Sequence, residues 1–349
     1  MTDDAYAVTG APATPAAPSA RRSPGPWRTA LGTLARDKVA MAALAVLLLV
    51  VLACLLAPVY AHSVAHTNPF TSHVDGTTVI DGKEQPVLAP STSGLGLGVT
   101  PIGPTWDLHH YFLGADGQGR DVMARLLCGG RNTLLIGAVS ALLCCVIAAI
   151  LGVVAGYFGG IVDAVLNWLF DVVWAFPVYL LAISLSVVLL TSGLDLGPVH
   201  ISGNSLWLPI VIIAMIYVPY VGRPLRSQVR SLRQRDFIQA AVGLGGGDAR
   251  ILRKDVLPNV MPTVLVFVPL MIAINMLTES ALSFLSIGVQ PPQASWGTLI
   301  NDGVGLLYTR PAVTLAPGLM IVITAVALNI LGDGVRSALD PKARLRGAA

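Results

Sequence analysis

Six long apolar stretches, each free or nearly free of charged residues, constrain this chain more than any other feature of its sequence. About 20 such residues cross the hydrocarbon core of a bilayer as a helix, since a helix satisfies its own backbone hydrogen bonds. With only 12% charged residues, the chain also has too few charges to cover a water-facing surface of its size. We therefore expect an all-α integral membrane protein with six spans, at residues 39–57, 133–156, 164–190, 205–222, 260–289 and 312–331.

The positions of lysine and arginine predict how these spans are oriented. Five basic residues precede the first span, eight lie between the fourth and fifth spans, and four follow the last, which makes 17 of the 22 in the chain. The positive-inside rule assigns this side to the cytoplasm. We therefore expect a multi-pass protein of the cell (inner or plasma) membrane with both termini in the cytoplasm.

The same patterns divide the chain into segments. Residues 1–26 are rich in Ala, Pro, Ser and Thr and lack apolar periodicity, which is typical of a disordered tail. A long external segment contains a stretch of β-formers at 77–80 that could make a small hairpin. The predicted organisation is a cytoplasmic tail at 1–26, the first span with its cytoplasmic approach at 27–60, an external loop with an insertion at 61–131, a five-span core at 132–335 that includes a cytoplasmic loop at 223–258, and a cytoplasmic tail at 336–349.

Motifs of the common enzymes do not occur in the sequence. None of the four lysines follows the glycines of a nucleotide-binding P-loop, and neither a zinc-protease nor a serine-hydrolase motif is present. The four cysteines lack metal-ligand spacing, and the pair His109-His110 fits a solvated loop better than a metal site. A net charge of +3 is too mild to imply a nucleic-acid partner. We therefore expect no enzyme activity, no catalytic residue, no cofactor and no metal.

Two acidic residues interrupt the predicted spans, Asp171 in the third and Glu279 in the fifth. Ionisable groups within a bilayer are costly and are often functional. They could contact a solute on its pathway, relay protons or switch between conformations. They could equally tie two helices together through hydrogen bonds. The sequence leaves these readings open, with helix-tying slightly favoured. Prolines within the spans, at Pro177, Pro219 and Pro269, predict kinks in a packed bundle.

The most informative segment is the basic loop between the fourth and fifth spans. Residues 236–244 predict a short helix with apolar side chains on one face, and the glycines at 245–247 predict a turn. Asp248 is placed to cap a second helix at 249–256, which Pro258 is expected to end. Small residues at the tip would let the backbone of another protein approach closely. A DNA-binding helix-turn-helix is a weaker interpretation in a membrane-embedded chain.

This segment also carries a spaced pattern. It resembles the cytoplasmic signature of the inner-membrane permease subunits of ATP-binding-cassette importers: Glu-Ala-Ala, three residues, Gly, nine residues, Ile, any residue, then Leu-Pro. Gln stands here in place of the Glu, and Asp255 in place of the Ile. The positions that correspond are Gln239, Ala240, Ala241, Gly245, Leu257 and Pro258.

Further motifs follow in the order expected for one branch of that family, and together they cover roughly residues 27–345. The chain is most similar to the second, or "C", permease of dipeptide, oligopeptide and nickel systems. The external insertion at 60–106 and the N-terminal tail exceed the usual length of that branch. The motifs lie at 36–38, 113–121, 156–160, 171–177, 278–285, 288–292, 295–297 and 331–334.

The resemblance implies a fold, a function and a set of partners. The fold would be the six-span bundle of a type I (MetI-like) importer permease, with the six signature residues as its ATPase-coupling loop. The partners would be a homologous second permease, two cytoplasmic ABC ATPase subunits that hydrolyse the ATP, and an external substrate-binding protein. The cargo would be di- or oligopeptides, or a related small solute such as nickel.

Two other functions remain open from the sequence. One is a proton-coupled secondary transporter that uses Asp171 and Glu279. The other is a membrane-anchored external binding or scaffold protein whose activity lies in the insertion at 60–106.

Overall fold

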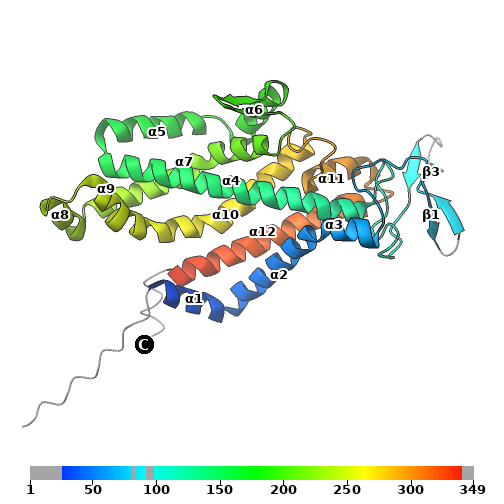
Figure 1. The fold of residues 1–349 in the computed structure, drawn as a ribbon, viewed down its shortest axis with the longest axis horizontal. Coiled ribbons are helices and arrows are strands. Elements are labelled where there is room, and N and C mark those ends of the chain that lie inside the picture. The colour runs from blue at the N-terminus through cyan, green and yellow to red at the C-terminus, as the bar shows by residue number, and fades with distance from the viewer. Residues whose placement is uncertain (1–25, 81–82, 92–97, 340–349) are drawn as a thin grey trace, which may run out of the picture.

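A computed structural model describes residues 26–80, 83–91 and 98–339, so most of the predicted tails lie outside the described residues. Helices dominate the described part and form an elongated bundle, with short β-hairpins at one end and along one side (Figure 1). The helical elements are α1 (Pro26–Arg36), α2 (Lys38–Leu55), α3 (Ala57–Val59), the π-helical turn η1 (Tyr60–Val64), α4 (Val122–Phe158), α5 (Gly160–Trp174), α6 (Val178–Ser192), α7 (Trp207–Arg233), α8 (Asp236–Gly243), α9 (Asp248–Ile251), the π-helical turn η2 (Leu252–Val256), α10 (Leu257–Phe284), α11 (Trp296–Gly303), the 3₁₀ turn η3 (Val304–Leu306) and α12 (Ala312–Leu339).

Among the described residues, five helical segments are long and apolar enough to cross a membrane: α2, α4, α7, the continuous rod Asp248–Phe284, and α12. Helices α5 and α6 make a sixth span if they are taken together, but they meet at an angle of 85°. The predicted third span is therefore broken. The break comes just before Pro177, which disfavours helical geometry in the residue that precedes it. Pro219 and Pro269, in contrast, lie inside helices that continue past them.

Several helices extend beyond the predicted spans, because charged residues at their ends are paired within the protein. Helix α4 begins at Val122, inside the predicted external loop, and its Arg125 binds Asp116 and Asp302. Helix α7 runs to Arg233 rather than ending near residue 222. Paired charges can continue a helix that an apolar pattern alone would end.

Helix α4 is the centre of the bundle and packs along much of its length against α7 and α10. Two glycines one turn apart make the contact with α7 close. A Cβ atom at Gly152 would lie 2.8 Å from the carbonyl oxygen of Gly222, and one at Gly156 would lie 2.6 Å from that of Arg226. Small residues at this spacing let helix backbones approach within a membrane, where packing rather than the hydrophobic effect drives association.

Residues 248–284 form one continuous rod from the basic loop into the membrane. The prediction that Pro258 ends a helix is wrong. Proline is tolerated in the first turn of a helix, and α10 starts at Leu257 and runs through it. The rod spans about 55 Å at 1.5 Å per residue, which is enough to connect the two surfaces of the bilayer.

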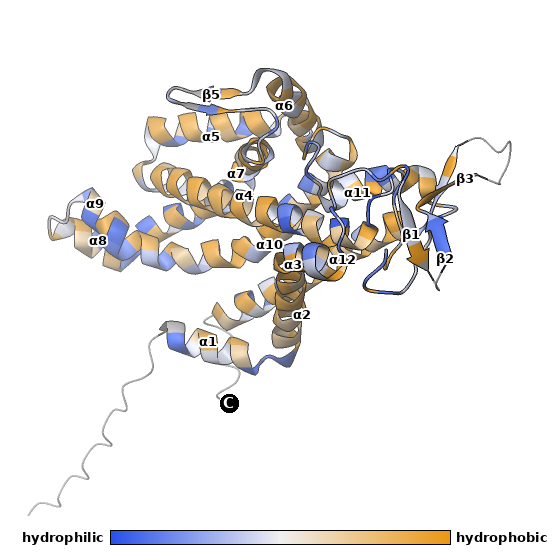
Figure 2. Cartoon of the chain, turned by 45° about the vertical axis from the view of Figure 1, so that its right-hand side comes forward, coloured by the Kyte–Doolittle hydropathy of each residue, from blue (hydrophilic) through white to orange (hydrophobic). Residues whose placement is uncertain are grey.

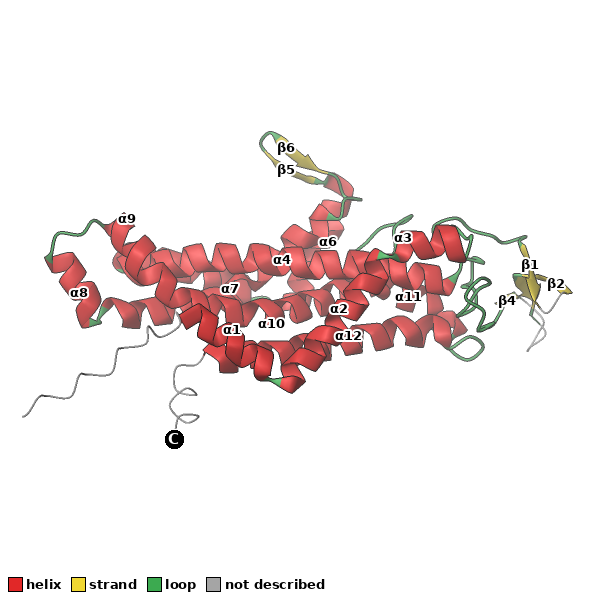
Figure 3. Ribbon diagram, turned by 60° about the horizontal axis from the view of Figure 1, so that its bottom comes forward, coloured by secondary structure: helices red, strands yellow, loops and turns green. Residues whose placement is uncertain are grey.

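The part of the chain that the structure describes has three antiparallel hairpins outside the helices: β1 (Thr77–Ile80) with β2 (Lys83–Pro86), β3 (Leu88–Pro90) with β4 (Val99–Pro101), and β5 (Leu194–Leu196) with β6 (Val199–Ile201). The first confirms the hairpin expected near residues 77–80. The strands β1 to β4 lie at the opposite end of the bundle from α8 and α9 (Figure 3). Hydrophilic residues are more frequent at these two ends than on the helices between them (Figure 2).

Candidate functional site

The basic loop folds as the predicted helical hairpin, with α8 and α9 joined by a tight turn at the end of the bundle. Gly245 has a φ of +76°, in the left-handed region that glycine adopts without strain. The next residue, Gly246, donates its N–H to the carbonyl of Ala241 at 3.0 Å. A Cβ atom at Gly246 would lie only 2.8 Å from that carbonyl oxygen. The glycines therefore allow the chain to reverse direction between the two helices.

One side of the hairpin is anchored and the other side is open. Ile238 and Ile251 are buried and hold α8 and α9 to the bundle, whereas Phe237, Val242 and Leu244 are exposed. Leu244, at the tip, is 87% exposed. A cluster of large apolar side chains on a water-facing tip is typical of a surface that another protein covers. The exposed face is therefore the candidate contact site.

The six signature residues fall into two groups. Gln239, Ala240, Ala241 and Gly245 belong to the hairpin, and Gln239 is exposed, with its side-chain amide 3.4 Å from the carbonyl of Gln234. The remaining two, Leu257 and Pro258, are exposed in the first turn of α10, within the rod 248–284 that continues from the hairpin. The hairpin is thus built directly on the rod that enters the membrane.

Polar contacts fix the hairpin to the ends of the neighbouring helices. Asp248 does not cap α9 as predicted. Gly247 occupies the cap position, and the Asp248 carboxylate instead accepts a hydrogen bond from the Tyr157 hydroxyl at 2.8 Å. The Arg233 guanidinium lies over the Tyr157 ring, 5.8 Å from its centroid. These residues border an open hollow of about 690 Å³ between the hairpin, the end of α4 and the start of α5. The hairpin therefore rests on α4 and α7 through a few specific contacts.

Asp171 has a partner that sequence reasoning did not identify. Its carboxylate accepts a hydrogen bond from Arg223 of α7 at 2.7 Å and one from Asn167 at 3.1 Å. The Arg223 guanidinium also lies 5.2 Å from the ring centroid of Trp174. A second carboxylate of α5, Asp163, forms an ion pair with Arg226. Two arginines spaced three residues apart on α7 thus hold α5 at two points, so Asp171 connects helices in the described structure.

Glu279 lies in a different environment, fully buried in α10. It accepts hydrogen bonds from Ser283 at 2.6 Å and from Ser280 at 3.4 Å. Further hydroxyl contacts come from Thr133 on α4 and from Ser295 just before α11. Both acidic residues therefore have partners that the sequence did not identify.

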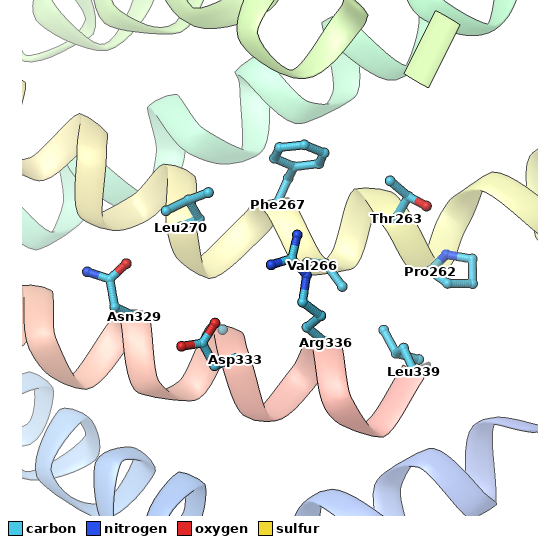
Figure 4. A pocket seen from close by; sticks show the side chains of 10 residues that line it. Pro262, Thr263, Val266, Phe267, Leu270, Asn329, Asp333, Arg336 and Leu339 are labelled. Atoms are coloured by element: carbon cyan, nitrogen blue, oxygen red, sulfur yellow. The ribbon is translucent and has the colours of Figure 1, made fainter. Parts of the chain in front are cut away.

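A second hollow, of about 410 Å³, lies between α10 and α12. Asn329, Asp333 and Arg336 are spaced so that they share one face of α12, and all three line it. Arg336 and Asp333 point from α12 toward α10 (Figure 4). Sequence reasoning missed this face, although Asp333 lies within the motif at 331–334.

At the opposite end of the bundle, four charged residues form a partly buried ion cluster. Asp116 binds Arg120 at 2.7 Å and Arg125 at 3.4 Å, and Asp302 binds each arginine at 2.9 Å. Arg125 also donates to the carbonyl of Pro69 at 3.0 Å. Asp116 and Arg120 belong to the motif at 113–121, but nothing in the sequence connected them to Asp302. The cluster ties the segment before α4 to α11.

Comparison with known proteins now places this arrangement in a family. Residues 148–345 match the model described as "Binding-protein-dependent transport system inner membrane component", and residues 25–75 match the N-terminal transmembrane domain of oligopeptide transport permease C. The chain belongs to the binding-protein-dependent permease family. It is therefore the permease subunit of an importer, a multi-pass membrane protein of a transport rather than an enzyme family.

Individual relatives agree with this assignment. The dipeptide transport system permease protein of Alkalihalophilus pseudofirmus is 31% identical over 318 residues, 91% of this chain and 90% of the relative. The glutathione transport system permease protein of Pectobacterium atrosepticum is 35% identical over 232 residues, 66% of this chain and 73% of the relative. An inward-facing structure of the MetNI methionine ABC transporter has a TM-score of 0.50 at 16% identity and covers 62% of this chain and 97% of its own. This likeness in fold agrees with the predicted MetI-like bundle.

Proposed function

We propose that this permease imports di- or oligopeptides, or a related small solute such as nickel, into the cytoplasm. Several relatives are named as permeases for dipeptides, oligopeptides or glutathione. The external binding protein would deliver the solute, and a homologous second permease would complete the pathway. This chain would supply no chemical catalysis, and two cytoplasmic ABC ATPases would provide the energy.

The observation that carries the proposal is the hairpin with its exposed apolar tip, joined without a break to the 37-residue rod Asp248–Phe284. An ATPase that grips the tip would move the rod directly, because a continuous helix transmits displacement along its axis. Gln239, Ala240, Ala241 and Gly245 would form the contact, with Leu257 and Pro258 at its base. Closure of two ATPases on ATP would then shift the permease pair between inward-facing and outward-facing states.

The proposed orientation places the hairpin in the cytoplasm, together with both termini. The distribution of basic residues supports it, and so does the separation of the hairpin from the strands β1 to β4 along the bundle. The external end would then hold the insertion and the ion cluster. The protein would reside in the cell, or inner, membrane.

Surfaces left open in the bundle support a second permease as partner. Ile161 and Trp168 of α5 are 83% and 64% exposed, and the hollow beside α12 carries Asp333 and Arg336. Within the described residues, neither of these two charged groups forms an ion pair. Ionisable groups at such positions face water-filled cavities or protein rather than lipid, so we propose that the second permease covers this face.

The two alternative functions find less support. A proton relay needs carboxylates that can gain and lose protons in series, but Asp171 is held by Arg223. An external scaffold would be expected to carry its own core. The insertion instead attaches to the bundle, for example through Arg310, which donates to the carbonyl of Pro101 at 2.6 Å.

Purification of a tagged chain under mild detergent tests the proposal. We expect a second permease and two ATPase subunits to co-purify, and the complex to take up labelled dipeptide in liposomes when ATP is present on the hairpin side and the binding protein is added on the other side. Uptake by this chain alone, without ATP, would contradict the proposal and would favour the proton-coupled alternative.

A further inference from the structure

The carboxylate of Glu279 is the centre of a buried set of hydroxyl groups. Ser280 and Ser283 reach it from its own helix, and Thr133 and Ser295 reach it from α4 and from the segment before α11. Each hydroxyl has a single proton to donate, and Ser280 and Ser283 donate theirs to Glu279. The residue thus joins α10 to the segment that follows it and to α4, which lies far away in the sequence.

Three of the four hydroxyls bind a second group at the same time. The Thr133 oxygen accepts the backbone N–H of Trp296 at 3.0 Å, the Ser295 oxygen that of Thr298 at 3.3 Å, and the Ser283 oxygen that of Val289 at 2.9 Å. All three donors belong to the segment 285–303, which follows α10. The hydroxyls that surround Glu279 therefore also accept hydrogen bonds from the backbone of this segment.

The packing around the carboxylate leaves the segment little freedom. A Cβ atom at Gly297 would lie 2.2 Å from the carbonyl oxygen of Ser280, and one at Gly130 would lie 2.7 Å from the Trp296 ring. Trp296 is fully buried and donates its indole N–H to the carbonyl of Leu126 at 3.0 Å. The segment is therefore fixed to α4 and α10 by close contacts that involve the Trp296 side chain and the backbone at Gly297.

The far end of the same segment carries Asp302, which binds Arg120 and Arg125 of the external ion cluster. A mechanical route can thus be followed through the described residues. It begins at the hairpin, follows the rod 248–284 to Glu279, crosses the hydroxyl contacts to the segment 285–303, and ends at the external loop.

We propose that Glu279 is a positioning residue that transmits movement of the hairpin to the external face of the permease. This inference rests on the proposed function, in which an ATPase moves the hairpin. Closely packed joints of this kind switch between discrete arrangements rather than deform continuously. Coupling between two sites is reciprocal. Binding-protein contact outside should therefore accelerate ATP hydrolysis inside only while Glu279 holds the joint.

The test uses the complete complex, purified with its ATPases and its binding protein, and measures ATP hydrolysis with and without saturating binding protein. In Glu279→Gln, an amide group brings donors to a site where hydroxyls already donate. We expect assembly and basal hydrolysis to be retained, and stimulation by the binding protein to fall about tenfold, within the usual range of coupling free energies. Glu279→Asp, which keeps the carboxyl group, should restore part of the stimulation.

Two further variants keep the outcome decisive. Thr133→Val removes one hydroxyl at nearly constant volume and should lower the stimulation in the same way, even if Glu279→Gln fails to assemble. Glu84→Gln makes the same chemical change on the exposed strand β2 and should have no effect. Full stimulation in Glu279→Gln, or equal losses of basal and stimulated hydrolysis in both test variants, would overturn the inference. Failure of the wild-type complex to hydrolyse ATP would instead contradict the proposed function.

Discussion

The hairpin tip gives the sharpest test of the proposed ATPase contact, through the substitution Gly245→Asp. The φ of Gly245 is +76°, and nothing lies within 4 Å of the position that a Cβ atom would take. A side chain there meets no clash and suffers only the strain of a left-handed backbone. That strain is roughly 1–2 kcal/mol for most residues and less for Asp, whose side chain can hydrogen-bond locally. The isolated permease should therefore insert and fold normally.

The effect on binding should be much larger than the effect on folding. The new carboxylate would stand beside Leu244 on the face that the ATPase is proposed to cover. Burial of an unpaired charge in an interface costs several kcal/mol, and each 1.4 kcal/mol is about tenfold in affinity. We expect Gly245→Asp to weaken ATPase co-purification by about a hundredfold or more and to abolish uptake. Gly245→Ala, which adds the same backbone strain without a charge, should keep the affinity within about tenfold of wild type.

A matched control separates the contact from the strain. Gly197, in the turn between β5 and β6, has a φ of +65° and equally open surroundings. Gly197→Asp therefore introduces the same backbone conformation and the same charge at a place outside the proposed interface. It should leave uptake within about twofold of wild type. Unchanged uptake in Gly245→Asp, or equal losses in the two variants, would refute the argument that the tip is covered by a partner.

Three further predictions follow from individual contacts. Burial raises the pKa of Asp121, so its ionised form is penalised in the folded state. Asp121→Asn can still accept the helix-capping hydrogen bond and should raise the melting temperature at pH 8. The gain should shrink at lower pH, because acid protonates the wild-type carboxyl group. Gly297→Ala forces a methyl group onto a backbone carbonyl, so it should lower the free energy of unfolding by about 1–3 kcal/mol and with it the melting temperature. Gly318→Ala, where a Cβ atom meets open space, should leave the melting temperature unchanged. A membrane-impermeant thiol reagent should label the exposed Arg253→Cys only from the cytoplasmic side and Val79→Cys only from outside; the reverse pattern would contradict the proposed orientation.

The sequence predicted the spans and the hairpin well because their signals are local. Uncharged runs of about 20 residues and glycines at a turn need no knowledge of tertiary contacts. Predictions failed where a distant partner changed the meaning of a residue. The charge of Arg125 predicts a loop outside the membrane span, yet the residue lies inside α4, where Asp116 and Asp302 form ion pairs with it. Pro258 signals a helix end, yet it lies in the first turn of α10.

The candidate site shows the same division. The signature residues of the hairpin could be located from spacing alone, whereas the contacts that support them could not. Asp248 has the sequence position of a helix cap, but its carboxylate instead accepts a hydrogen bond from the hydroxyl of Tyr157, 91 residues earlier in the chain. The hydroxyl groups around Glu279 are ordinary serines and threonines in the sequence. They are distinguished only because they meet in space from three parts of the chain. Sequence periodicity does not predict such tertiary contacts.

The ion cluster at the proposed external end has a practical consequence for engineering. The loop that carries β1 to β4 is fastened near its C-terminal end by Arg120 and Arg125, and near its middle by the bond from Arg310 to Pro101. A change of length between β1 and β2 would therefore not reach the membrane helices. An epitope or a fluorescent reporter could be grafted there, which would make working transporters visible on intact cells.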